Sequence, residues 1–452
     1  MTTPHDPKPP RATLDGGFLD EVSAELRDAN ALFAEAHPGE GDSRQPVHTV
    51  YGGAQLFSFD TAPKIAKVAQ RAMDDYAPDA ATLGAALGIM EHPALATIDT
   101  RVREKLAREA VEDFRIDFED GYGNRPDAEE DHHCAVVAAQ LIWGMEEKTL
   151  PSFIGMRIKP LNEELRGRSI RTLDLVMTAL ADAGKVPDNW ILTVPKITIL
   201  EQVEFIVRVL DRLEKDLGFD DGALRFEAMV ETPQIILDAR GKSLLPQLVD
   251  AAEGRMSAAH FGTYDYTAGT NITAAYQRMQ HPACEFAKQV MQVSLAGTGV
   301  WLSDGSTTVL PVAIHRGDGL TDEQRLENTA SVQAAWRMHF DDVRHSLAGG
   351  FYQGWDLHPA QLVSRYGALY SFFLEGIDAA GARLRNFVDK AAQATLVGDV
   401  FDDAATGQGL LNFFLRGINS GAITEDEALA MTGLTADEFR GRSFVRIMKG
   451  RK

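Results

Sequence analysis

Apolar positions along this chain form short runs that alternate with longer amphipathic stretches. Short apolar or β-branched runs predict buried strands, and apolar positions that recur every three or four residues predict helices. The predicted strands are His48–Tyr51, Ile116–Glu119, Phe153–Ile158, Ile191–Val194, Phe226–Val230, Ala258–Phe261, Gly299–Leu302 and Tyr352–Leu357. Helices are predicted over segments such as Ala66–Asp75, Ala128–Trp143, Ile170–Ala183, Ile199–Leu217 and Thr321–His345.

This alternation favours a parallel α/β fold. The number of strands is the one that closes a (β/α)8 TIM barrel, although an open doubly wound sheet fits the same count. Polar residues gather at the ends of the predicted strands and directly after them, which favours the barrel, because active-site loops follow the strands there. We therefore expect a barrel with an apolar interior and a site at its carboxyl end.

The barrel does not account for the whole chain. Residues 1–12 hold four prolines and few apolar groups, which predicts a disordered tail, and residues 18–35 have helical spacing. The last 75 or so residues contain no convincing strand and predict a helical appendage. We divide the chain into an N-terminal tail and helix (1–45), a catalytic barrel (46–375) and a C-terminal helical domain (376–452).

Composition narrows the class of protein. The 45 Lys and Arg against 66 Asp and Glu give a net charge of −21, which argues against a nucleic-acid binder. Cys134 and Cys284 are the two cysteines, so a disulfide framework is not expected. No apolar stretch is long enough for a membrane span, and the start lacks a signal-peptide core, so we expect a cytoplasmic protein without a membrane partner.

Two acidic residues carry the strongest chemical signal. Glu231 lies in Val-Glu-Thr-Pro after one predicted strand, and Asp265 lies in Phe-Gly-Thr-Tyr-Asp after the next. The segment between them has a plausible length for one strand–helix–strand unit, so both carboxylates would end at the same edge of a parallel sheet. Two carboxylates with room for water and substrate suit Mg²⁺ better than zinc.

Other strand ends carry further candidates. Glu119 and Asp120, in Asp-Phe-Glu-Asp-Gly, could hold the water shell of a divalent ion, or could simply begin a helix whose dipole favours acids. Arg157 suits carboxylate recognition, with a structural ion pair as the alternative. Lys196 could bind a substrate anion or form a salt bridge at the barrel mouth.

Other apparent motifs are weaker. Gly241-Lys242-Ser243 lacks the glycine of a phosphate-binding loop, because that position is Ile236. His132-His133-Cys134 has no second ligand cluster nearby in the sequence, which argues against a transition-metal site.

Six motifs in order resemble those of the HpcH/HpaI aldolase and citrate lyase β-subunit superfamily, which includes malyl-CoA lyases and malate synthases. They are Asp-Phe-Glu-Asp (117–120), Met-Arg-Ile (156–158), Val-Pro-Lys (194–196), Val-Glu-Thr-Pro (230–233), Phe-Gly-Thr-Tyr-Asp (261–265) and His-Pro-Ala-Gln (358–361). The resemblance implies a (β/α)8 barrel with Mg²⁺ held by Glu231 and Asp265. It further implies that Arg157 contacts a 2-oxoacid and that Glu119 and Asp120 surround the metal waters.

With the resemblance in place, we also predict substrate contacts from Lys196, Gly262 and Thr263. The small-molecule partner would be a 2-oxoacid, with an acyl-CoA or a free acid as its co-substrate. Relatives with this barrel are trimers or hexamers whereas malate synthases can be monomers, so both a monomer and a homo-oligomer stay open.

The tail gives a second resemblance. Phe401-Asp402-Asp403-Ala404-Ala405-Thr406 and the segment after it look like the C-terminal helical domain of malate synthases. In those enzymes an acidic pair supplies the aspartate that removes a proton from acetyl-CoA, and the matching residue here is Asp403. Its structural alternative is a helix cap.

These residues predict a Mg²⁺-dependent enzyme that makes or breaks a carbon–carbon bond beside a 2-oxoacid. Three alternatives remain: a pyruvate-type aldolase on free hydroxy acids, phosphoryl transfer on phosphoenolpyruvate, and a barrel that serves as a non-catalytic subunit.

Overall fold

A computed structural model describes residues 13–389, 395–397, 400–402 and 404–451. Eight parallel strands form a closed barrel, with neighbours in sequence order and β8 paired to β1. The strands are β1 (His48–Gly53), β2 (Asp113–Asp117), β3 (Phe153–Arg157), β4 (Trp190–Val194), β5 (Phe226–Val230), β6 (Met256–Phe261), β7 (Trp301–Ser306) and β8 (Gln353–Asp356). The predicted TIM-barrel class is confirmed, and the open doubly wound alternative is wrong.

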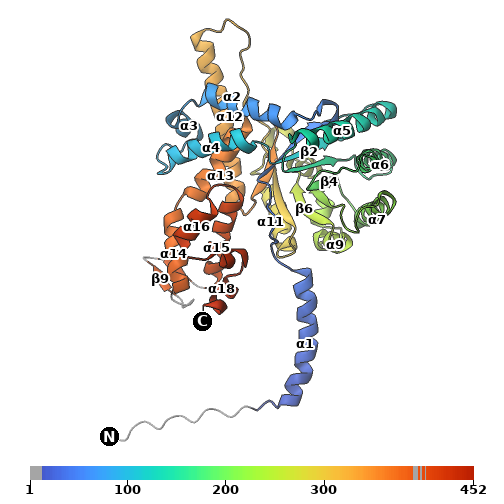
Figure 1. The fold of residues 1–452 in the computed structure, drawn as a ribbon, viewed down its shortest axis with the longest axis vertical. Coiled ribbons are helices and arrows are strands. Elements are labelled where there is room, and N and C mark those ends of the chain that lie inside the picture. Colours follow the sequence, from blue (N-terminus) through green and yellow to red (C-terminus); the bar gives the residue numbers. More distant parts are fainter. Residues whose placement is uncertain (1–12, 390–394, 398–399, 403, 452) are drawn as a thin grey trace.

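Helices surround this barrel and form a separate group beside it (Figure 1). Around the barrel lie α2 (Thr61–Tyr76), α3 (Ala80–Leu87), α4 (Leu95–Glu109), α5 (Asp127–Glu147), α6 (Arg166–Asp182), α7 (Leu200–Leu217), α8 (Pro233–Ile236), α9 (Leu245–Ala251), α10 (Thr263–Gly269), α11 (Pro282–Leu295), α12 (Asp322–Ala348) and α13 (Gln361–Leu374). The 3₁₀ turns are η1 (Ala54–Leu56) and η2 (Ala274–Tyr276). Within the described residues, no helix is both long and apolar enough to cross a bilayer.

Two of the predicted strands were misplaced along the chain. Strand β2 begins at Asp113 instead of Ile116, and β7 covers Trp301–Ser306 instead of Gly299–Leu302. In β2 the cause is visible in the sequence, because Asp113, Arg115 and Asp117 alternate with apolar residues. A charged face of this kind hides the strand from a search for apolar runs.

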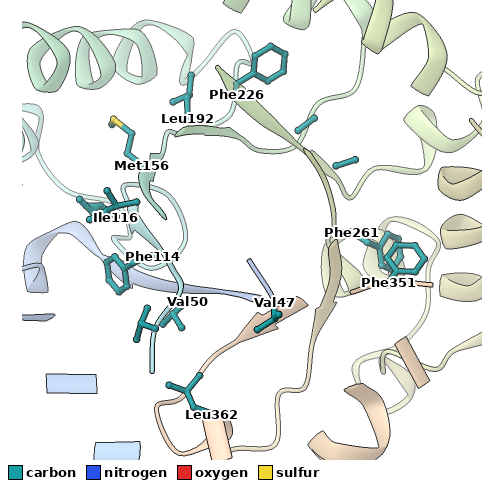
Figure 2. Close-up of a cluster of buried hydrophobic side chains, with 14 of the residues drawn as sticks. Val47, Val50, Phe114, Ile116, Met156, Leu192, Phe226, Phe261, Phe351 and Leu362 are labelled. Atoms are coloured by element: carbon teal, nitrogen blue, oxygen red, sulfur yellow. The ribbon is translucent and has the colours of Figure 1, made fainter. Parts of the chain in front are cut away.

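The apolar core lies between the strands and the helices. Ile116, Met156, Leu192 and Phe226 project outward from the ring of strands, as Figure 2 shows, and each is almost completely buried. These residues occupy alternate strand positions, so the intervening positions point into the barrel. The outward face therefore supplies most of the hydrophobic burial that stabilises the fold.

The barrel interior is polar, which contradicts the expected apolar filling. Arg115 donates to both oxygens of Glu227 at 2.8 Å and pairs with Asp113, while His260 Nε2 lies 3.1 Å from Glu227. All four side chains are buried. Burial would favour the neutral acid, but Arg115 and His260 hold the pKa of Glu227 well below its usual value. Because these charged side chains pair with one another, their attraction offsets part of the cost of burying them.

Helix α1 (Gly16–Ala36) extends away from the barrel (Figure 1), and none of its residues is buried. At the other end of the chain, α14 (Ile377–Asp389), α15 (Ala404–Asn419), α16 (Glu425–Thr432), α17 (Ala436–Arg440) and α18 (Phe444–Gly450) share a hydrophobic cluster of their own. This part also contains the antiparallel strands β9 (Thr395–Val397) and β10 (Val400–Asp402), so the expectation of no strand there is wrong. The predicted domain boundaries stay predictions.

Candidate active site at the carboxyl end of the barrel

The carboxyl ends of the strands form the barrel mouth, and most of the predicted site residues lie there. Arg157 is the last residue of β3, Glu231 directly follows β5, and Asp265 lies in the short helix α10 that follows β6. Glu119 and Asp120 follow β2. We call Glu119, Asp120, Glu231 and Asp265 the mouth carboxylates. Parallel closure of the barrel brings them to one end of it, as a βα-barrel does with residues that follow its strands.

Lys196 links the four mouth carboxylates. Its backbone N–H donates to Glu231 Oε1 at 2.7 Å. The Nζ atom pairs with Glu119, and lies 3.2 Å from Asp120 Oδ2 and 3.8 Å from Asp265 Oδ2. Lys196 has a backbone φ of +49°, a left-handed conformation that costs a non-glycine residue about 1 kcal/mol or more. This conformation aims the N–H at one acid while the side chain reaches the others.

Glu231 lies in a place that disfavours its charge. Only 2% of its surface is exposed. Burial, together with the nearby charge of Asp265, raises the pKa of Glu231 to about 8. Gly262 packs so tightly against this side chain that a Cβ there would lie 2.4 Å from Oε2 and 2.5 Å from Cβ of Glu231. Gly262 therefore makes room for the carboxylate, and the substrate contact predicted for Gly262 stays a prediction.

Arg157 is buried and held on both sides. Its Nε donates to Asp117 Oδ1 at 2.8 Å and its Nη2 to Asp117 Oδ2 at 2.5 Å, while Nη1 lies 3.2 Å from Glu119 Oε2. The ring of Tyr51 stacks under the guanidinium, with its centroid 4.8 Å from Cζ. Burial opposes the charge of Arg157, but these acids raise its pKa, so it stays a cation. This arrangement fixes the direction of the guanidinium.

The remaining mouth carboxylates are perturbed in different directions. Burial and the charge of Asp120 raise the pKa of Asp265, against the effect of Lys196. Burial also raises the pKa of Glu119, whereas Lys196 and Arg157 outweigh burial at Asp120 and lower the pKa of that group. Ionisation is therefore opposed at Glu119, Glu231 and Asp265 and favoured at Asp120.

A hard cation fits this set of donors. No cluster of three or more His, Cys, Asp or Glu side chains arranged for a metal ion exists among the described residues. However, Mg²⁺ keeps several waters and needs only one or two protein carboxylates. Burial and the charge of Asp265 raise the pKa of Glu231, and burial with the charge of Asp120 raises that of Asp265, so a nearby cation would favour the ionised form of both acids. The two carboxylates are thus chemically compatible with a bound magnesium ion.

Thr263, predicted as a substrate contact, is buried at 1% exposure. Its hydroxyl faces Gly305 of β7, where a Cβ would come within 2.0 Å of Oγ1, and it has no hydrogen-bond partner among the described residues. Its role as a substrate contact stays a prediction.

Several polar residues at strand ends point away from the mouth. Asp356 is held by His48, His339 and Arg365 on the outer side of the barrel, at 2.9, 3.0 and 2.8 Å. Asp304 pairs with Lys288 at 3.0 Å in the same outer layer. These acids join strands to helices and take no part in the candidate site.

The hydrogen bonds of the His-Pro-Ala-Gln motif (358–361) connect parts of the backbone. His358 Nδ1 accepts the N–H of Ala360 at 3.2 Å, and Gln361 Oε1 accepts the N–H of Leu357 at 2.7 Å. Gln361 also donates to Thr307 O at 2.9 Å, which ties α13 to the segment after β7.

Sequence reasoning missed two residues that position Arg157. Asp117 was noted only as the first residue of the Asp-Phe-Glu-Asp motif, and Tyr51 was not singled out. The signal for both is strand alternation, because Tyr51 pairs in register with Arg115 and Asp117 with Arg157, which places their side chains on the inward face.

Asp403, the predicted catalytic base, lies outside the described residues. The described C-terminal helices attach near the amino-terminal end of the barrel. Asn419 exchanges hydrogen bonds with the backbone of Gln45 at 2.8 and 3.0 Å, and Gln45 in turn donates to Gln353 at the start of β8 at 3.1 Å. To reach the barrel mouth of the same chain, the C-terminal domain would have to break those hydrogen bonds.

Comparison with known sequence families gives one match. The family described as Domain of unknown function (DUF6986) matches residues 26–447, nearly the whole chain. The chain belongs to this family. No curated protein matches the sequence.

Solved structures share the fold. A citrate lyase from Burkholderia xenovorans is 17% identical, with a TM-score of 0.57 over 87% of this chain and 97% of that one. A malate synthase from Haloferax volcanii, in a complex with magnesium and glyoxylate, is 12% identical, with a TM-score of 0.46 over 89% of this chain and 99% of that one. At 17% identity the likeness to the citrate lyase concerns the fold alone.

Proposed function

We propose that this protein is a Mg²⁺-dependent lyase or synthase that breaks or forms a carbon–carbon bond next to the carbonyl of a 2-oxoacid. The observation that carries the proposal is the meeting of Glu231 and Asp265 at the barrel mouth, close enough for Asp265 to raise the pKa of Glu231. Arg157, a buried cation at the end of β3, lowers the pKa of both acids through its charge. The ordered resemblance to the citrate lyase β-subunit superfamily supports the same reading.

Glu231 and Asp265 would hold the metal. When bound there, Mg²⁺ would supply Lewis-acid polarisation of the substrate carbonyl. Arg157 would pair with the substrate carboxylate through donor hydrogens that Asp117 does not use, and its fixed direction would orient the 2-oxoacid. Glu119 and Asp120 would accept hydrogen bonds from water around the metal.

A second group is required to remove a proton from the carbon nucleophile. We assign this role to Asp403 from the resemblance of 401–406 to malate synthases. The proton would move to its carboxylate, which therefore has to come within hydrogen-bonding reach of the nucleophile's acidic carbon. Protein motion would have to bring it there, because the described part of its domain is attached near the other end of the barrel.

The test is a panel of reactions with and without Mg²⁺. Thiol release from acetyl- or propionyl-CoA with glyoxylate favours a synthase, and cleavage of malyl- or citramalyl-CoA without hydrolysis favours a lyase. Turnover only of free acids, such as pyruvate with aldehydes, favours the pyruvate-type aldolase. Phosphoryl transfer from phosphoenolpyruvate would replace the proposal, and no turnover in any reaction would favour a non-catalytic subunit.

A further inference from the structure

One side chain already places a positive charge among the mouth carboxylates. The Nζ atom of Lys196 pairs with Glu119 and lies 3.2 Å from Asp120 and 3.8 Å from Asp265. The fourth acid, Glu231, accepts the backbone N–H of the same residue at 2.7 Å. A divalent cation bound to Glu231 and Asp265 would share at least one carboxylate with this ammonium group.

We propose that, in the metal-free protein, the ammonium group of Lys196 stands in for the divalent cation, and that Mg²⁺ binds by displacing it. This inference rests on the metal site of the proposed function. It assigns Lys196 a role other than a substrate contact or a fixed salt bridge: a built-in counter-ion that competes with the metal.

The other cation of the mouth cannot play this part. Arg157 is buried, and Asp117 holds it by two hydrogen bonds. Lys196 is different, since 28% of its side chain is exposed and its flexible stem lets the ammonium move into solvent. Because the backbone N–H supplies the bond to Glu231, that bond can persist when the ammonium leaves.

Electrostatics predicts whether removing the Lys196 ammonium strengthens or weakens Mg²⁺ binding. A unit charge about 4 Å from a carboxylate interacts strongly with it at the dielectric constants found near protein surfaces. Removing the ammonium would leave the mouth carboxylates without that partner and would increase their attraction for Mg²⁺. If Lys196 instead only held the carboxylates in position for the metal, its removal would weaken Mg²⁺ binding, which is the opposite sign.

The experiment is calorimetric titration of the full-length protein with Mg²⁺ alone. We expect Lys196→Met to bind Mg²⁺ about tenfold tighter or more, because a competing unit charge is gone. Lys196→Asn serves as a second neutral variant, since Asn tolerates a positive φ better than most residues. Lys196→Arg retains the charge and should bind Mg²⁺ within about threefold of the wild type.

A matched control separates local from overall charge. Lys185 is a half-exposed residue that pairs with Glu146, so Lys185→Met changes the net charge by the same amount and should leave Mg²⁺ affinity unchanged. In thermal unfolding, metal-free Lys196→Met should melt below the wild type, and saturating Mg²⁺ should remove the difference.

Equal or weaker Mg²⁺ binding by both neutral variants would overturn the inference, as would the absence of binding in every protein. These measurements need no substrate. A wild type that turns over a 2-oxoacid substrate with Mg²⁺ while its neutral variants bind Mg²⁺ no tighter would therefore refute the role of Lys196 and leave the proposed function standing.

Discussion

Both carboxylate oxygens of Asp117 hold the guanidinium of Arg157, through Nε at 2.8 Å and Nη2 at 2.5 Å. The two residues are the last of adjacent strands and are paired in register. Asp117 also accepts the N–H groups of Glu119 and Gly121 at 2.9 and 2.7 Å. One acid thus fixes both the arginine and the loop that carries two mouth carboxylates.

Asp117→Asn should release Arg157, while Glu231 and Asp265 remain available to bind the metal. We expect kcat/KM for the 2-oxoacid to fall by about 10- to 100-fold, because small errors in the position of a binding group are costly. Mg²⁺ affinity, measured by calorimetry, should stay near the wild-type value. A parallel loss of Mg²⁺ binding would mean that Asp117 organises the metal ligands as well.

Glu231→Gln should have opposite effects on stability and activity. Near neutral pH the buried acid is held mostly protonated, whereas it would ionise in the unfolded chain, so a neutral amide should stabilise the metal-free protein by about 1–3 kcal/mol, while Mg²⁺-dependent turnover is abolished. Thermal unfolding and the activity panel measure the two effects.

Asp265→Asn should also abolish turnover, with a smaller change in stability because Asp265 is exposed. Full activity in both variants would end the magnesium proposal.

Asp403→Asn should reduce turnover far more than Mg²⁺ affinity if Asp403 is the catalytic base. The substitution retains the size of the side chain and removes its capacity to take a proton. Turnover and calorimetric Mg²⁺ binding are to be compared in the same preparation. Comparable losses in both would point to a structural role such as a helix cap.

Asp356→Asn should destabilise the protein without touching the candidate site. Burial opposes ionisation of Asp356, but Arg365 and two histidines hold its pKa well below the usual value. Removing one member of a buried charged cluster costs about 3–5 kcal/mol. Denaturant unfolding measures this loss, and Mg²⁺ affinity of the folded fraction should not change.

The control for that variant is Asp341→Asn, which breaks the exposed pair with Arg337. Exposed ion pairs contribute about 1 kcal/mol or less, so this change should be small. If Asp356→Asn cost no more than the control, the buried cluster would not be a source of stability.

The barrel could be predicted because its signals are local. Strand β5 lies at the predicted Phe226–Val230, since a short buried run with the single charged residue Glu227 differs from a helix in length and in its flanking residues. Strand β2 was misplaced because its inward face is charged. Strand β7 was misplaced as well, and its pairing with β8 shifts register between Ser303 and Ser306, a feature that depends on the partner strand.

Only part of the candidate site could likewise be predicted from the sequence. Glu231, Asp265 and Arg157 could be chosen from the sequence because each follows or ends a predicted strand. The same rule applies equally to Asp304 and Asp356, which end or lie in their strands but point outward to helices. Strand alternation separates the two groups only after the beginning and the register of each strand are known.

The sequence by itself determined the alternation of strands and helices, the parallel α/β class and the set of charged residues near strand ends, because side-chain periodicity is a property of each segment alone. Only the tertiary structure decided which of these charges meet. In the closed barrel, Asp113, Arg115 and Glu227 pair in a polar centre. Asp117 holds Arg157 in place, and Lys196 contacts all four mouth carboxylates. The physical reason is closure: a side chain faces the mouth, the interior or the helices according to the register of eight strands together.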